Sequence, residues 1–202
     1  MNNFDFIKNE KLANQIKFAI EIDKMKRILR MNLHSDGSAR ENDAEHSWHL
    51  AIMAVLLEEY SKDKVDIGRV IKIALVHDLV EVYAGDTFAY DSKGYEDKEQ
   101  REKDAATKLF GILDPVQGAE FRALWDEFEA KETPESRYAN AIDRIQPLIL
   151  NYLTDGHTWK LGDVHSAQIL KRMDIIRTTC PELWPIVEGI IETSINAGIL
   201  KP

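Results

Sequence analysis

The sequence predicts an all-α protein that forms a single domain, a helical bundle, and three observations support this prediction. Apolar residues recur three or four positions apart almost throughout the chain, which is the spacing of a helix face, and no segment alternates convincingly with period two. A length of 202 residues is within the range that one hydrophobic core can serve. Only 10 Gly and 6 Pro interrupt the chain, and no repeat or linker divides residues 1–202.

The expected helices follow from the apolar spacing and from the turn formers between helices. In order they cover about 8–30, 43–60, 66–85, 96–113, 121–128, 133–152, 164–178 and 181–197. Asp43, Asp66 and Thr133 are the expected N-caps, and Gly85 and Gly198 the expected stops. Pro147 is expected to kink its helix, and residues 86–95 are expected to form a loop.

Composition excludes several classes of function. The chain carries 26 basic and 35 acidic residues, a net charge of −9, so we expect no nucleic-acid polymer as a partner. A small anionic substrate is still compatible with this charge, because local cations can override the net field. No apolar run reaches the length that crosses a bilayer, and the single Cys180 cannot form an internal disulfide. We therefore expect a cytoplasmic protein without membrane partners.

The segment around His77-Asp78 carries the first candidate chemistry. Glu81 follows His77 by four residues and Asp78 by three, so a continuous helix would place all three on one face of an otherwise apolar element. Asp86 follows the helix stop at Gly85 directly. A divalent cation would satisfy such a group, but hydrogen-bonded core pairs would also do so, and spacing alone does not separate these alternatives.

Two further candidates lie far from this segment in the sequence. His46 stands in Asp43-Ala44-Glu45-His46-Ser47, and Asp143 lies between Ile142 and Ile145 on a helix expected to be largely buried. A buried carboxylate needs a partner, so Asp143 is a candidate ligand for the same cation.

The order His46, His77-Asp78, Asp143 resembles the signature of the HD-domain metal-dependent phosphohydrolases. The resemblance extends to the segments 40–47, 77–87 and 125–130, which are similar to the small single-domain branch that includes bacterial 5′-deoxynucleotidases. It covers about residues 10–155, so the metal-site core is expected there. Helices over about 160–198 are expected to pack on that core.

The resemblance implies roles for individual residues. His46, His77, Asp78 and Asp143 would hold one divalent ion, for which Mn²⁺, Co²⁺ or Fe²⁺ suits the mixed imidazole and carboxylate set and Mg²⁺ is possible. Glu81 would assist proton transfer, and Asp86 would position water or the leaving group. Arg27 matches the substrate-binding Arg of the family. Ile28 stands where the deoxynucleotidases carry a Trp, which puts discrimination of the sugar in question.

The resemblance implies a phosphomonoester hydrolase acting on nucleoside 5′-monophosphates, with 5′-deoxynucleotides favoured. It also implies a homodimer, which an exposed apolar face on the last helices would support. Two alternatives stay open. One is a nucleotide-sensing module with a structural metal, and the other is a di-iron oxygenase, for which His49 is the obvious extra ligand.

Overall fold

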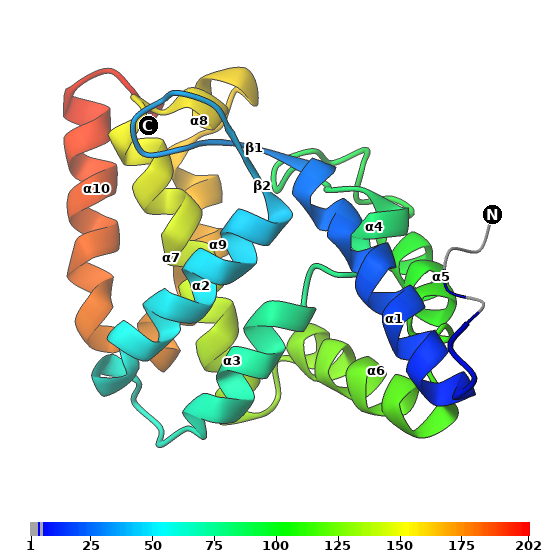
Figure 1. The fold of residues 1–202 in the computed structure, drawn as a ribbon. Coiled ribbons are helices and arrows are strands. Elements are labelled where there is room, and N and C mark those ends of the chain that lie inside the picture. Colours follow the sequence, from blue (N-terminus) through cyan, green and yellow to red (C-terminus); the bar gives the residue numbers. More distant parts are fainter. Residues whose placement is uncertain (1–3, 5) are drawn as a thin grey trace.

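The computed structural model describes residue 4 and residues 6–202, and helices dominate it (Figure 1). The longer helices are α1 (Glu10–Ile22), α2 (Asp43–Leu56), α3 (Ile67–Val76), α5 (Lys98–Phe110), α6 (Pro115–Ala130), α7 (Pro134–Leu153), α9 (Ser166–Thr179) and α10 (Trp184–Asn196). Shorter helical turns are η1 (Asp23–Arg27), η2 (Glu58–Tyr60), α4 (Glu81–Ala84), α8 (His157–Leu161) and η3 (Pro181–Leu183). The all-α prediction is confirmed.

One small hairpin departs from the prediction. Strands β1 (Leu29–Leu33) and β2 (Arg40–Asn42) pair antiparallel, so the expected helix over 8–30 is wrong beyond Ile22. The chain passes through η1 and becomes extended at Ile28, with φ −87° and ψ 115°. Within β1 apolar and polar residues do alternate, but Asn32 is buried while Leu29 is exposed. The polar face of this strand is turned inward.

Side-chain caps fix where the site-bearing helices begin. Asn42, rather than Asp43, caps α2 through a reciprocal capping box with Glu45. Asp66 caps α3 and Thr133 caps α7, as predicted. These caps fix the residue at which each of the three helices begins.

The third predicted helix is interrupted, which corrects the expectation of one continuous face from His77 to Glu81. Helix α3 ends at Val76, with His77 as its C-cap, and α4 starts at Glu81. Between them the backbone forms tight turns. The N–H of Leu79 donates to the carbonyl oxygen of Val76, and the N–H of Glu81 donates to that of Asp78. Asp78 and Glu81 are therefore placed by a tight turn. Gly85 ends α4 at φ 76°, as predicted for a stop.

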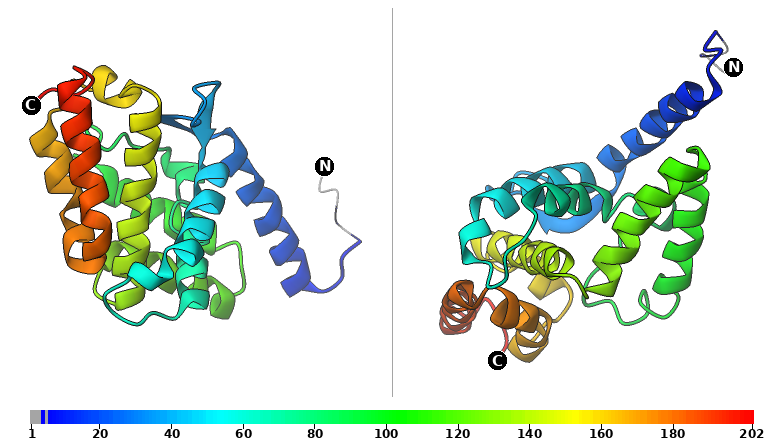
Figure 2. Two further views of the ribbon diagram at one scale, coloured as in Figure 1. Left: turned by 90° about the vertical axis from the view of Figure 1, so that its left-hand side faces the viewer. Right: turned by 90° about the horizontal axis from the view of Figure 1, so that it is seen from below.

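Two clusters of buried hydrophobic residues surround the site. The larger is centred on α7, which packs against α2, α3, α6, α9 and α10. The smaller joins α1, α5 and α6 with the end of α3, and Figure 2 shows this group at one side of the molecule. In the described part of the chain, no helix combines the length and apolar character required to cross a membrane.

Candidate active site and metal centre

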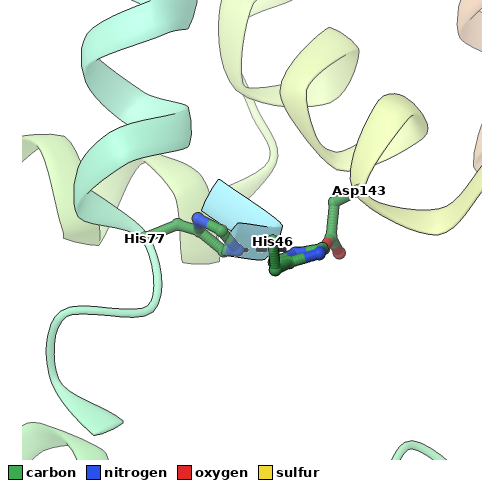
Figure 3. Close-up of side chains that lie close together, drawn as sticks. All are labelled: His46, His77 and Asp143. Atoms are coloured by element: carbon green, nitrogen blue, oxygen red, sulfur yellow. Dashed lines mark hydrogen bonds and ion pairs between the residues drawn. The ribbon is translucent and has the colours of Figure 1, made fainter. Parts of the chain in front are cut away.

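The predicted ligands converge between the two clusters. His46 comes from the second turn of α2, His77 from the end of α3 and Asp143 from the middle of α7, and all three are buried (Figure 3). Asp78 follows His77 in the turn and points to the same place. The fold thus brings together the four residues that the sequence predicted as ligands.

The facing atoms are close enough to share one ion. The Nε2 atom of His46 lies 3.1 Å from Oδ1 of Asp143 and 3.8 Å from Oδ2 of Asp78. The Nε2 atom of His77 lies 3.0 Å from Asp78 and 3.8 Å from Asp143. Ligands about 2.1 Å from a divalent ion lie roughly 3.0–3.4 Å apart, so this spacing fits such an ion.

The other ring nitrogen of each histidine is anchored. Nδ1 of His46 lies 3.1 Å from Oε1 of Gln146, and Nδ1 of His77 lies 2.7 Å from the carbonyl oxygen of Ala74. These acceptors place the proton on Nδ1 and leave Nε2 free to bind a metal, as in most metal-binding histidines. Nε2 of His77 is buried and makes no well-directed hydrogen bond, although Asp78 lies 3.0 Å away, and a bound metal ion would satisfy this nitrogen.

The pKa shifts of the ligand side chains indicate which charges a metal ion would replace. Burial opposes charge on Asp143, but the hydrogen bond from His46 and the charge of His77 hold its pKa well below the usual range. Burial also opposes charge on His77, yet Asp78 and Asp143 raise its pKa. Without a cation, protons on the imidazoles compensate the two carboxylates. Metal binding must displace those protons.

A second acidic group adjoins the first. Carboxylate oxygens of Asp43, Glu81 and Asp86 lie within 4.8 Å of one another, and Asp43 and Glu81 are buried. Both oxygens of Asp43 and Oε2 of Glu81 have no hydrogen-bond donor. Burial and the charge of Asp78 raise the pKa of Asp43 to about 7 and that of Glu81 well above its usual value. The group can hold a proton or a further cation.

Arg30 connects the two groups, and the sequence reasoning missed it. Its Nη1 lies 2.7 Å from Asp78, 3.5 Å from Asp43 and 4.0 Å from Asp86. Its Nε lies 3.8 Å from Glu41. The available signal was the alternation in Leu29-Arg30-Met31-Asn32-Leu33, which marks a strand with a polar face.

Beside the metal centre a pocket opens between β1, the loop after α4, and helices α7 to α9. Its apolar wall includes Met31, Phe88, Tyr90 and Trp159, and the rings of Phe88 and Tyr90 pack edge to face with centroids 5.5 Å apart. Arg30 and Asp86 line both this pocket and the one at the metal centre. A ligand bound at the ion could therefore extend into the aromatic pocket.

Not every predicted site residue reaches these pockets. Arg27 is exposed at the end of η1, and Ile28 packs against the smaller hydrophobic cluster. Neither lines the two pockets, because the chain turns extended at Ile28 and brings Arg30 and Met31 inward instead. His49 lies 3.2 Å from the amide nitrogen of Gln146 and is not in the ligand group.

The helical fold and the buried His, His, Asp, Asp group define a helical metal-binding domain. The model of the HD domain family matches residues 22–184. The chain belongs to the HD domain family, and the resemblance found in the sequence is confirmed.

Curated relatives and solved structures support this assignment. The chain is 30% identical to the 5′-deoxynucleotidase HDDC2 of Danio rerio over 139 residues, 68% of each chain. It is 24% identical to the human HDDC2 over 66% of this chain and 65% of that protein. A crystal structure described as a predicted metal-dependent phosphohydrolase from Magnetospirillum magnetotacticum MS-1 matches with a TM-score of 0.92 and 47% identity, covering 97% of this chain and 98% of that one.

Proposed function

We propose that the protein is a metal-dependent phosphohydrolase that cleaves nucleoside 5′-monophosphates, with 5′-deoxynucleotides favoured, into nucleoside and phosphate. The observation that carries the proposal is the group of His46, His77, Asp78 and Asp143, of which the last three line a pocket that shares Arg30 and Asp86 with the aromatic pocket. The 5′-deoxynucleotidase names of the relatives support the substrate class.

The proposed cofactor is one divalent ion bound by these four residues. Two imidazoles and two carboxylates suit Mn²⁺, Co²⁺ or Fe²⁺, and Mg²⁺ is possible. When bound, such an ion polarises the phosphoryl group and lowers the pKa of a bound water. The group of Asp43, Glu81 and Asp86 offers room for a further cation, so the number of ions per chain is a direct test of the one-ion proposal.

Glu81 is the proposed proton carrier. It starts α4, is buried, and lies beside Asp43 and Asp86. Burial and the neighbouring carboxylates raise its pKa, which favours the protonated carboxyl group that would deliver a proton to the leaving ester oxygen. Burial also raises the pKa of Asp86, which is placed by Gly85 at the junction of the two pockets and is proposed to orient the leaving group.

Arg30 and Met31 take the substrate-binding places that the sequence assigned to Arg27 and Ile28. Arg30 keeps the acidic groups together and lines both pockets. Met31 is the next residue and lines the pocket proposed for the nucleoside. The base would lie against Phe88, Tyr90 and Trp159, whose faces accept any base by stacking.

The alternatives have less support. His49, the extra ligand expected for a di-iron oxygenase, lies against Gln146 and outside the ligand group. A structural metal would be enclosed by its ligands, whereas His77, Asp78 and Asp143 line an accessible pocket.

A homodimer and a cytoplasmic location are also proposed. Helix α2 exposes an apolar face made of Trp48, Ile52, Val55 and Leu56, with Trp48 64% and Leu56 71% exposed. An exposed apolar face on the last helices would also have supported a dimer, but on α10 only Ile186 is an exposed large hydrophobic residue. An isologous contact of two α2 helices would cover this face. Cys180 is buried and free, which suits a reducing compartment.

The decisive experiment is a turnover screen of the purified protein. Deoxyribonucleoside and ribonucleoside 5′-monophosphates, diphosphates and triphosphates should be supplied with Mn²⁺, Co²⁺ or Mg²⁺, and released phosphate measured. We expect inorganic phosphate from monophosphates. Pyrophosphate or triphosphate as the main product would refute the proposed function.

A further inference from the structure

The pocket at the metal centre has a second, basic side that the proposed mechanism does not use. Besides the acidic groups and Arg30, four cations line it, Lys98, Lys131, Arg144 and Arg172. They come from separate elements, since Lys98 begins α5, Lys131 caps the end of α6, Arg144 lies on α7 and Arg172 on α9. The fold gathers them from distant parts of the sequence.

Three of these cations lack a counter-charge. Arg30 is surrounded by carboxylates, and Lys98 pairs with Glu102. Among the described residues, no carboxylate oxygen lies within 4.0 Å of the charged groups of Lys131, Arg144 or Arg172. Arg144 donates only to the side-chain oxygen of Asn140, at 3.2 Å, and Glu129 lines the same pocket without an ion pair.

Lys131 is held in a backbone conformation that disfavours lysine. As the C-cap of α6 it has φ 56° and ψ 32°, in the left-handed region where glycine is the usual residue. Lys131 lines the wall of the pocket, so this conformation is consistent with a role for its side chain there. Burial and the charge of Arg144 also lower the pKa of Lys131, so the cations repel one another as they stand.

We propose that Lys131, Arg144 and Arg172 form an anion-binding subsite that holds the non-bridging oxygens of the phosphoryl group to be cleaved. This assignment rests on the proposed function. A phosphate dianion would lie between the ion's ligands on one side and these cations on the other. It would supply the counter-charge that the three lack, and two arginine forks suit phosphate geometry. Arg144 and Arg172 also line the aromatic pocket, so they stand where the phosphate joins the nucleoside.

The test begins with anion binding to the metal-free protein. After EDTA treatment, inorganic phosphate should be titrated calorimetrically and its effect on the Tm recorded, for the native protein, Arg172→Gln and Lys131→Gly. The matched control is Lys171→Gln, which removes one charge from the exposed neighbouring position on α9. We expect phosphate affinity to fall at least tenfold in both subsite variants and to stay unchanged in the control.

Lys131→Gly separates a binding role from a structural one. Glycine relieves the left-handed backbone, so without phosphate the Tm of this variant should equal or exceed that of the native protein. Its kcat/KM for a nucleoside monophosphate should nevertheless fall at least tenfold, mainly through KM. A lower Tm together with unchanged phosphate affinity would show that Lys131 is structural.

Two results would overturn the proposal. If the metal-free native protein and metal-free Arg172→Gln bind phosphate with equal affinity, the proposed subsite does not exist. If Arg172→Gln binds phosphate more weakly but turns over monophosphates unchanged, the subsite does not hold the phosphoryl group that is cleaved. Because phosphate binding is measured without metal or turnover, its outcome is separate from failure of the proposed hydrolase activity.

Discussion

Asp143 and Glu81 are both buried carboxylates, yet we expect their removal to have different effects. Asp143→Asn replaces an anionic ligand by a weak neutral one, so bound metal and activity should both be lost. Glu81→Gln keeps the shape beside the centre but cannot carry a proton, so metal content should persist while kcat falls on the order of 10²-fold. Metal analysis and kcat on both variants check this. Full activity in Glu81→Gln would exclude Glu81 as the proton carrier.

Met31 is the residue at which sugar selection can be tested. It follows Arg30 and lines the aromatic pocket, whereas Ile28 packs in a hydrophobic cluster. An apolar pocket rejects an added hydroxyl only weakly unless bulk blocks it. Met31→Trp should therefore raise the ratio of kcat/KM for deoxyribonucleoside over ribonucleoside monophosphates. Ile28→Trp is the comparison, and it should lower stability without changing that ratio.

At the residue scale, sequence reasoning found the ligands but not their cationic partners. His46, His77, Asp78 and Asp143 are types with metal-binding chemistry, so their identity carries the signal. Arginine is an ordinary surface residue, so residue type does not single out Arg30 or Arg172, and the short alternation over residues 29–33 is the one local feature that separates Arg30 from Arg27. Only the extended backbone after Ile28 selects between them.

At the scale of elements, apolar spacing predicted the helices but not their interruption. Leu79, Val80 and Val82 continue the apolar run past Val76, so the pattern does not register the turn at His77. The strand β1 was missed because it is short and its most buried residue is the polar Asn32, while Leu29 is exposed, the reverse of the usual arrangement. Both departures occur where the chain supplies site residues.

The cap of α2 should matter for both stability and metal binding. Asn42 accepts from the backbone N–H of Glu45, and Glu45 accepts from that of Asn42. Asn42→Ala should lower the free energy of unfolding by about 1 kcal/mol. It should also weaken metal binding, because His46 lies in the next turn. Urea unfolding and metal titration measure the two effects. Asn9→Ala, at the cap of α1, is the control, and it should leave metal affinity unchanged.

The exposed face of α2 gives a second prediction about a helix. If α2 forms the dimer contact, Trp48→Glu or Ile52→Glu should produce a monomer, because a charge would be buried against its copy. Light-scattering mass measurement on the native protein and both variants is the test. A matched substitution is Ile186→Glu on α10, which should leave the mass unchanged. A native monomer would contradict the proposal.

For the whole molecule we predict metal affinity that rises with pH. In the metal-free protein Asp143 and Asp78 raise the pKa values of His46 and His77 against the effect of burial. Protons must leave these rings before Nε2 can bind a metal, so affinity should increase about tenfold per pH unit for each proton displaced. Calorimetric titration with Mn²⁺ in buffers of different ionisation enthalpy would count the protons. Affinity independent of pH between 6 and 9 would contradict this protonation scheme.

The four ligands come from three helical segments that are far apart in the sequence, and this has a kinetic consequence. An ion bound to α2, to the end of α3 and to α7 acts as a cross-link across the larger core. Cys180 is the only cysteine of the sequence, so no internal disulfide can cross-link the core in this way. Opening of the chain must then wait for the ion to leave. Unfolding of the metal-loaded protein should therefore be limited by metal dissociation and become faster when a chelator is present.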